Sequence, residues 1–213
     1  MTSRPLIGVL AMQGAFREHA AALRAAGADA VEVRTEAQLA AVGALVLPGG
    51  ESTTIRKGLV AAGLYEPLRE RLAAGMPALG TCAGLIVLAH AEADGAPDSY
   101  GLFDIEVERN GWGRQPYSFE GAVEFDDVVP GADGRAGTHS CTGVFIRAPR
   151  ITAVGSGVEV IARLASGKDA GEPVAVRQGT LLGCTFHPEL TDDLSLHRLL
   201  VGSCKGGLVG RAQ

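Results

Sequence analysis

The chain has 213 residues, 46% of them hydrophobic and 5% aromatic, and its 19 Lys and Arg against 24 Asp and Glu give a formal net charge of −5. This balance argues against a nucleic-acid-binding protein, which would carry a basic face, and the apolar content argues against a disordered chain. No uninterrupted apolar stretch approaches the ~18 residues of a membrane-spanning helix, so we expect neither a nucleic acid nor a membrane as a partner. The length fits one large domain.

The first half of the chain alternates strands and helices. Continuous apolar runs predict strands that are buried on both faces, at 6–12, 30–33, 44–47 and 77–81. Helices are predicted at 16–26, 65–74 and 84–93, with another that Ser52 or Thr53 can cap and that runs towards Ala62. This alternation implies a parallel sheet with helices on both faces and right-handed crossovers.

The second half changes character. Short strand-like runs separated by Gly, Asp and Pro occur at 103–109, 119–125, 143–147, 158–164, 173–177 and 180–186, and a helix is predicted at 194–201. The polar, Gly-rich segment 130–142 is predicted to be a mobile loop, and the tail 205–213 is expected to fray. The predicted fold is therefore a single α/β domain, residues 1–204. It has three layers, with a mostly parallel central sheet flanked by helices and extended by antiparallel strands in the second half.

The cysteines point to a reducing compartment. Four of them are scattered along the chain without a Cys-x-x-Cys pair, which favours neither a disulfide framework nor a zinc site: Cys82, Cys141, Cys184 and Cys204. The apolar run 6–12 after Arg4 looks like a signal peptide, but polar residues follow at once, so a strand and a cytoplasmic location are predicted. His139 and Cys141 are two possible metal ligands in one loop, too few to predict a metal site.

The sharpest local feature is Gly80-Thr81-Cys82-Ala83-Gly84, which an apolar strand enters and a helix leaves. Glycines on both sides of one reactive residue match the nucleophile elbow, a tight turn that exposes its side chain at the carboxyl end of the sheet. The amide groups and positive dipole at the start of the next helix favour a thiolate. Cys82 is therefore the candidate nucleophile; the alternative is a buried cysteine in a Gly-rich turn.

A base for this thiol follows the last predicted strand, in His187-Pro188-Glu189. Pro188 forces His187 into an extended conformation, in which residues i and i+2 point the same way. Glu189 can then sit beside the imidazole and fix its tautomer, as the third member of a catalytic triad does. A lone surface histidine at a strand end is the alternative, but an elbow cysteine together with His-x-Glu is much harder to explain by chance.

A third element, Pro48-Gly49-Gly50-Glu51-Ser52, again lies between an apolar strand and a helix. Paired glycines let the backbone approach a ligand and let one peptide turn its N–H inward. This suits an oxyanion hole formed by Gly50 together with the amide of Ala83. A phosphate loop or a plain turn is the alternative, and without GxxxxGK[ST] or GxGxxG nucleotide binding has little support.

Together these motifs resemble the class I, triad-type glutamine amidotransferases, which implies a flavodoxin-like fold. More narrowly, the chain is similar to the glutaminase-subunit family of pyridoxal 5′-phosphate synthase. Six blocks in that family's order, spread over roughly residues 6–200, carry the similarity: 8–14, 48–53, 80–86, 109–115, 145–149 and 186–190. The early Gln-Gly, the GGEST form, and the RN-x-x-GRQ and FIRAP blocks separate this family from other amidotransferases.

The resemblance implies hydrolysis of L-glutamine to glutamate and ammonia. The ammonia would pass to a separate synthase subunit that makes pyridoxal 5′-phosphate, which is a product, so no cofactor and no metal are expected. Cys82 would be the nucleophile, His187 the base and Glu189 its orienting residue. The glutamine site would be lined by Gly49, Gly50, Glu51, Arg109, Ile146 and Arg147. A guanidinium can grip the α-carboxylate of glutamine through two hydrogen bonds, although either arginine could also be a plain surface charge.

The family further implies that the oxyanion-hole peptide forms only when the synthase docks. Our hypothesis is that the isolated chain is nearly inactive and that Gln13, near the site mouth, helps to sense the partner. Two features depart from the family: Trp112 replaces a smaller aromatic, and the connection 126–142 looks longer than usual. Alternatives remain open: an amidotransferase of another pathway, such as imidazole-glycerol-phosphate synthesis; a catalytically silent binding module; or a cysteine peptidase or chaperone-like relative. The remaining histidines fit helix faces or a loop: His19, His90, His139 and His197.

Overall fold

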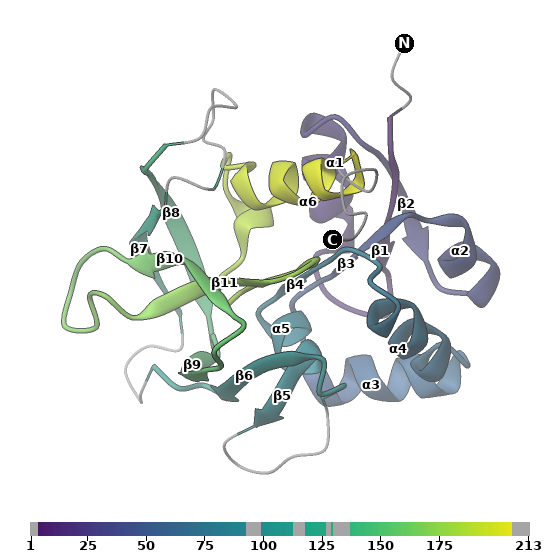
Figure 1. Ribbon diagram of the computed structural model, residues 1–213, viewed down its shortest axis with the longest axis horizontal. Coiled ribbons are helices and arrows are strands. Elements are labelled where there is room, and N and C mark those ends of the chain that lie inside the picture. The colour runs from purple at the N-terminus through teal and green to yellow at the C-terminus, as the bar shows by residue number, and fades with distance from the viewer. Residues whose placement is uncertain (1–3, 93–98, 113–117, 127–128, 130–136, 206–213) are drawn as a thin grey trace, which may run out of the picture.

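A computed structural model of the chain describes residues 4–92, 99–112, 118–126, 129 and 137–205. Within these residues, nine strands form one sheet in the order β2-β1-β3-β4-β12-β11-β10-β7-β8, and three more form a small sheet in the order β5-β6-β9. Helices cover both faces of the large sheet, which gives the three layers seen in Figure 1. The predicted α/β fold class is therefore confirmed.

The parallel half of the large sheet comes from the apolar runs of the sequence. It consists of β2 (Asp29–Val33), β1 (Leu6–Leu10), β3 (Ala44–Leu47), β4 (Ala78–Thr81) and β12 (Leu181–Cys184), each parallel to its neighbour. β3, β4 and β12 are buried over their whole length, as strands covered on both faces should be. The order 2-1-3-4 is that of flavodoxin-like sheets.

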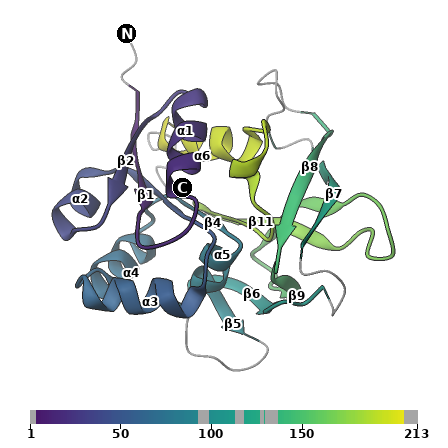
Figure 2. The same ribbon diagram turned by 180° about the vertical axis from the view of Figure 1, so that it is seen from behind.

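Two groups of helices cover the two faces of this sheet. α1 (Phe16–Ala25) and α6 (Ser195–Lys205) share one apolar cluster on the first face. The opposite face carries α2 (Glu36–Ala41), α3 (Ser52–Ala61), α4 (Tyr65–Ala73) and α5 (Ala83–Leu88) in a second cluster. Figure 2 shows the same division from behind. The sheet thus separates two apolar cores, one on each of its faces.

The second half of the chain extends the sheet with antiparallel strands, as predicted. These are β11 (Pro173–Gln178), β10 (Glu159–Leu164), β7 (Ser118–Phe125) and β8 (His139–Ile146). The small sheet is made of β5 (Ala89–Glu92), β6 (Phe103–Glu108) and β9 (Arg150–Val154).

The predicted helix at 84–93 is wrong in its second half, because α5 ends at Leu88 and Ala89–Glu92 forms β5. The carbonyl oxygens of Val87, Leu88 and Ala89 accept hydrogen bonds from the backbone amides of residues 100–102 instead of continuing the helix. Long-range strand pairing therefore overrides a helical pattern. His90 consequently lies on a strand and not on a helix face.

Two further elements, α2 and β9, are absent from the sequence prediction. A signal for α2 was present, because Thr35 and Gln38 form a capping box in which each side chain bonds the other residue's backbone N–H. β8 begins at His139, so residues 139–142 of the predicted loop belong to a strand.

The remaining loop and tail predictions fall partly outside the described residues. Residues 130–136 of the predicted mobile loop, and 206–213 of the predicted tail, are among those not described. Lys205 is the last residue of α6, so the predicted tail begins one residue too early. Every helix in the described part of the chain is too short or too polar to cross a membrane.

Candidate active site

Four loops that follow parallel strands meet at one edge of the large sheet. Gln13 follows β1, the Gly49-Gly50 pair follows β3, Cys82 follows β4 and His187 follows β12. The carboxyl ends of parallel strands are where open α/β sheets bind their ligands. The topology thereby brings together motifs that lie far apart in the sequence.

Cys82 occupies a strained turn between β4 and α5. Its φ is 50° and its ψ is −106°, a combination that residues with a side chain rarely adopt. A Cβ added to Gly84 would overlap the carbonyl oxygen of Leu47, and one on Gly80 would overlap the backbone of Gly84. Because packing requires a glycine on each side, the turn has the geometry of a nucleophile elbow.

We expect Gly84→Ala to lower the free energy of unfolding by about 3 kcal/mol, because the methyl group would collide with backbone that cannot move aside. Urea unfolding measures the change. Gly202→Ala is the control, since a Cβ at this position in α6 meets nothing within 4 Å. Equal stability of the two variants would contradict the packing argument.

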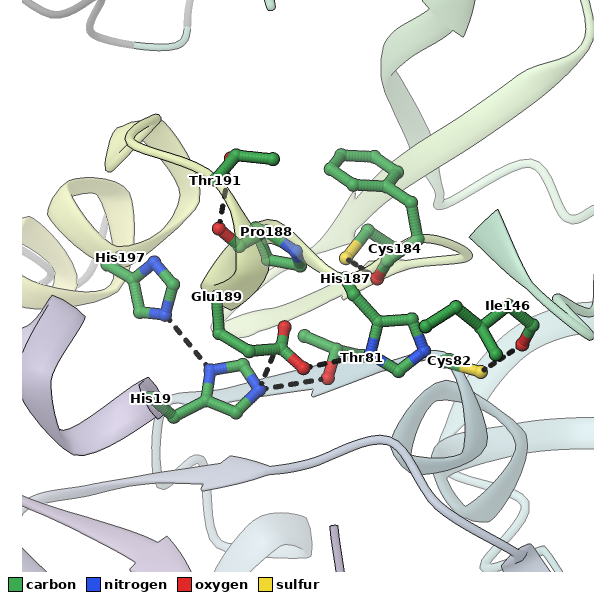
Figure 3. A network of polar contacts seen from close by, with 11 residues as sticks. His19, Thr81, Cys82, Ile146, Cys184, His187, Pro188, Glu189, Thr191 and His197 are labelled. Carbon is green, nitrogen blue, oxygen red and sulfur yellow. Dashed lines mark hydrogen bonds and ion pairs between the residues drawn. The ribbon is translucent and has the colours of Figure 1, made fainter. Parts of the chain in front are cut away.

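His187 and Glu189 form a buried pair beside Cys82 (Figure 3). Nδ1 of His187 lies 2.8 Å from Oε1 of Glu189, and the Cys82 side chain lies close enough to the imidazole to raise its pKa. Sγ of Cys82 also lies 3.8 Å from the carbonyl oxygen of Ile146. The predicted pairing is present, but the predicted extended backbone is not, because Pro188–Leu190 forms a 3-10 turn that brings the carboxylate back to the ring.

The imidazole of His187 holds its proton strongly. Burial opposes the charged form, but the hydrogen bonds with Cys82 and Glu189, together with their negative charges, outweigh it and raise the pKa of His187 to about 10. At neutral pH His187 is therefore an imidazolium that lies between Cys82 and Glu189.

Cys82 differs from two other thiols in the described part of the chain. Burial raises the pKa of Cys184 well above its usual range, and burial together with the charge of Asp193 raises that of Cys141 to about 12. Both thiols therefore stay protonated at neutral pH, and a protonated thiol is a poor nucleophile. Cys82 instead faces a cation.

A cavity of about 280 Å³ opens in front of Cys82 and His187. Predicted site residues on its wall are Gln13, Gly50, Glu51, Cys82, Ala83, Arg109, Ile146, Arg147 and His187, and the sequence reasoning missed Ser52, Ile86 and Asn110. The described non-glycine residues with positive φ are Cys82, Asn110 and Arg147, and all of them line this cavity. Strained backbone is concentrated at functional sites, so these φ values mark the same cavity as the predicted site residues. They could not have been predicted from the sequence.

Gly49 packs against His187 and is not among the residues that line the cavity: a Cβ at Gly49 would overlap Cε1 of His187. A glycine here lets the imidazole pack directly against the loop. The contact with glutamine predicted for Gly49 remains a prediction.

The carboxylate of Glu51 turns towards α3. It accepts hydrogen bonds from the backbone N–H groups of Thr53 and Thr54 and from the Thr54 hydroxyl. These bonds, foremost that of the hydroxyl, lower the pKa of Glu51 to about 2. Glu51 is therefore the N-cap of α3, and the predicted cap at Ser52 or Thr53 is wrong because the longer carboxylate reaches two amides at once.

The mouth of the cavity carries the remaining predicted residues. Oε1 of Gln13 accepts a hydrogen bond of 3.2 Å from the backbone N–H of Glu51, and thereby ties the Gly-Gly loop to the end of β1. Nη1 of Arg109 lies 3.9 Å from Oε1 of Glu51 and 3.5 Å from Oγ1 of Thr53. Arg147 is exposed on the cavity wall.

The departure at Trp112 is accommodated by packing. Its ring lies edge-on to Phe119 and Phe145, and its Nε1 donates to the carbonyl oxygen of Pro149 at 3.0 Å. Residues 113–115 of the same block, and most of the longer connection before β8, lie outside the described residues.

Nε2 of His139, one of the two possible metal ligands in the sequence, lies 2.9 Å from Oγ of Ser195. Among the described residues no three His, Cys, Asp or Glu side chains are grouped to hold a metal ion.

The sequence reasoning missed two buried histidines behind the triad. His19 and His197 are fully buried, and Nε2 of His19 lies 3.2 Å from Oε2 of Glu189. A signal was available: His19 and Leu23 lie on the same buried face of α1, where a polar residue needs a partner. The identity of that partner could not be read from the sequence.

The fold and the site together are those of a triad-type amidotransferase, with Cys82, His187 and Glu189 at the carboxyl edge of a flavodoxin-like sheet. The chain belongs to the SNO glutamine amidotransferase family, whose model matches residues 9–206. The resemblance drawn from the sequence is therefore confirmed.

Curated relatives agree with this assignment. A protein of Acidothermus cellulolyticus named pyridoxal 5′-phosphate synthase subunit PdxT is 54% identical over 202 residues, which cover 94% of each chain. One of the same name from Parafrankia sp. is 54% identical over 201 residues, covering 93% of each chain.

Solved structures show the same fold. One described as a glutamine amidotransferase has a TM-score of 0.80 at 43% identity, over 93% of this chain and 98% of the other. PurLQS from Thermotoga maritima has a TM-score of 0.65 at 18% identity, over 95% of each chain, which shows the fold alone.

Proposed function

We propose that this chain is the glutamine-hydrolysing subunit of a pyridoxal 5′-phosphate synthase, which converts L-glutamine to L-glutamate and ammonia. The observation that carries the proposal is the buried Cys82–His187–Glu189 array at the floor of a cavity, in a chain of this family. The steps proposed below use side chains and backbone amides of the chain and call for no cofactor. We also propose a cytoplasmic location, which suits four free thiols.

In the first half of the reaction, the Cys82 thiolate attacks the side-chain amide carbon of glutamine and a C–S bond forms. The oxyanion is held by the backbone N–H of Ala83, which begins α5 and has no partner within the helix, and by that of Gly50. The His187 imidazolium gives its proton to the nitrogen, the C–N bond breaks and ammonia leaves. A γ-glutamyl thioester remains.

In the second half, the acylated sulfur no longer carries a charge. The interactions with Cys82 that raise the pKa of His187 are then lost, and the imidazole that donated its proton stays neutral. It can take a proton from water, which adds to the thioester carbonyl. The C–S bond breaks, glutamate leaves, and the thiolate–imidazolium pair is restored.

Arg109 and Arg147 are proposed to hold the α-carboxylate of glutamine, because both guanidinium groups belong to residues on the cavity wall. The ionised Glu51 beside Arg109 keeps that guanidinium at the mouth and supplies a negative charge for the α-ammonium group. The remaining proposed contacts come from the backbone of Gly49, Gly50 and Ile146.

We propose that the partner is a synthase subunit and that Gln13 couples its docking to the site. Gln13 is bonded to the Glu51 amide, one residue after the oxyanion glycine. A partner that draws the Gln13 side chain away would free the loop to present the Gly50 N–H. Hydrolysis would then occur only where its ammonia can be used.

The proposed function is tested by mixing this chain with a synthase subunit, a pentose phosphate and a triose phosphate. We expect glutamine-dependent formation of pyridoxal 5′-phosphate, and glutaminase activity at least about 10-fold above that of the isolated chain, as expected when docking completes an oxyanion hole. In Gln13→Ala, the ratio of glutaminase activity with the synthase subunit to that without it should be smaller, because the bond between Gln13 and the Glu51 amide is absent. Glutamine hydrolysis without coenzyme formation would point to another amidotransferase pathway, and full activity of the isolated chain would refute the coupling.

A further inference from the structure

Behind the triad, the buried side chains of His19 and His197 form a polar chain. The proposed reaction does not use these two histidines. Nδ1 of His19 lies 3.0 Å from Nε2 of His197, which joins α1 to α6. Nε2 of His19 lies 3.2 Å from Oε2 of Glu189 and 3.2 Å from Oγ1 of Thr81. Figure 3 shows this chain running from His197 through His19 to Glu189 and His187. Buried polar rings cost free energy unless they are paired, so the arrangement calls for a role.

The contacts decide which nitrogen of His19 carries the hydrogen. An unprotonated Nε2 would place its lone pair 3.2 Å from a carboxylate oxygen of Glu189, which would repel it. Nε2 is therefore the N–H nitrogen, and it faces Oε2 of Glu189 and Oγ1 of Thr81. Nδ1 of His19 is then the acceptor and Nε2 of His197 the donor, while Nδ1 of His197 has no hydrogen-bond partner among the described residues.

Both rings are neutral. Burial, followed by the neighbouring His197 and His187, holds the pKa of His19 well below its usual value, and burial lowers that of His197 to about 4. A cation at position 19 would compete with His187 for the carboxylate. A neutral N–H leaves the charge of Glu189 to the imidazolium.

We propose that His19 is a positioning residue of the triad. Its Nε2–H, hydrogen-bonded to Oγ1 of Thr81, lies 3.2 Å from the second carboxylate oxygen of Glu189 and attracts it, so that the first oxygen stays aligned with His187, while His197 fixes the tautomer of His19. Oε2 of Glu189 is buried and makes no hydrogen bond of good geometry within the described residues. The 3.2 Å approach of His19 is the polar contact that restrains it.

The test compares His19→Leu, which removes the N–H, with His19→Gln, whose amide nitrogen replaces Nε2. We expect kcat for glutamine to fall about 10-fold in the leucine variant and to recover to within about 3-fold in the glutamine variant, the scale seen for residues that orient a reacting group. The alkaline limb of kcat/KM should move to lower pH in His19→Leu, because a loosened carboxylate supports the imidazolium less. Leu23→Val, on the same buried face of α1, controls for packing.

Alkylation of Cys82 by iodoacetamide is followed over the same pH range, because it reports on the Cys82–His187 pair without glutamine. The effect on turnover rests on the proposed function, but the alkylation profile does not. A wild-type chain that hydrolyses no glutamine while its alkylation still depends on His19 would overturn the function and keep this proposal. Equal losses in His19→Leu and His19→Gln with an unmoved limb would overturn the proposal.

If His19→Leu does not fold, His197→Leu tests the same claim, because it keeps His19 but removes the donor that fixes its tautomer. The limb should then move in the same direction by a smaller amount. A limb that stays in place in a folded His197→Leu variant would overturn the proposal.

Discussion

Cys82→Ala is expected to abolish release of ammonia from glutamine. Removing the nucleophile of a triad lowers kcat on the order of 10⁵–10⁶-fold, because the base and the oxyanion hole then have no covalent step to assist. The fold should persist, with a change of about 1 kcal/mol or less in the free energy of unfolding, since the small side chain fits the elbow that the flanking glycines permit. Ammonia release measured with the synthase subunit present, together with urea unfolding, checks both statements.

Cys141→Ala is the matched control, because Cys141 belongs to β8, contacts a different surface pocket and stays protonated at neutral pH. It should retain wild-type turnover. In parallel, iodoacetamide at neutral pH should label Cys82 ahead of Cys141 and Cys184. Turnover retained by Cys82→Ala would show that the elbow is not the reaction centre, and absence of labelling at Cys82 would favour a catalytically silent module.

The parts of this site that could be predicted are those whose geometry follows from neighbouring residues. The elbow is a local motif: Gly80 is required by a contact within the strand-turn-helix itself, and Gly84 by the backbone of the neighbouring strand β3 at Leu47. The His187–Glu189 pair is two residues apart, so its contact survived even though the backbone reason given for it was wrong. Placing Cys82 beside His187 depended only on both following parallel strands.

The parts that failed depend on partners far away in the sequence. The second half of the predicted helix at 84–93 became β5 because residues 100–102 supply hydrogen bonds that no local pattern reveals. His19 was assigned to a helix face, correctly, but its neighbours Glu189 and His197 come from the other end of the chain. Glu51 was placed in the site while the use of its carboxylate, as a helix cap, was not foreseen.

Glu189→Gln should lower kcat roughly 10²–10⁴-fold although it preserves the shape of the side chain. The amide can present its NH2 group to Nδ1 of His187, which then has to accept, and Nε2 carries the hydrogen that blocks it from acting as a base. The variant also removes a negative charge 2.8 Å from the ring. Glu172→Gln is the control. It removes a carboxylate from an ion pair with Arg150, and neither residue lines the cavity, so turnover should stay near wild type.

Glu189→Gln should also change the pH dependence of the reaction in a definite direction. In the wild type the imidazolium persists up to a pKa of about 10, raised by Cys82 and Glu189 against the effect of burial. Burial lowers the pKa of His187, and without the Glu189 charge only Cys82 counteracts it. The pKa of His187 therefore falls, and the proton needed by the departing ammonia is lost at lower pH. The alkaline limb of kcat/KM should therefore shift downward in Glu189→Gln, and alkylation of Cys82 near pH 8 should slow because fewer imidazolium ions stabilise the thiolate. An unshifted limb with reduced kcat would mean that Glu189 orients the ring without tuning its charge.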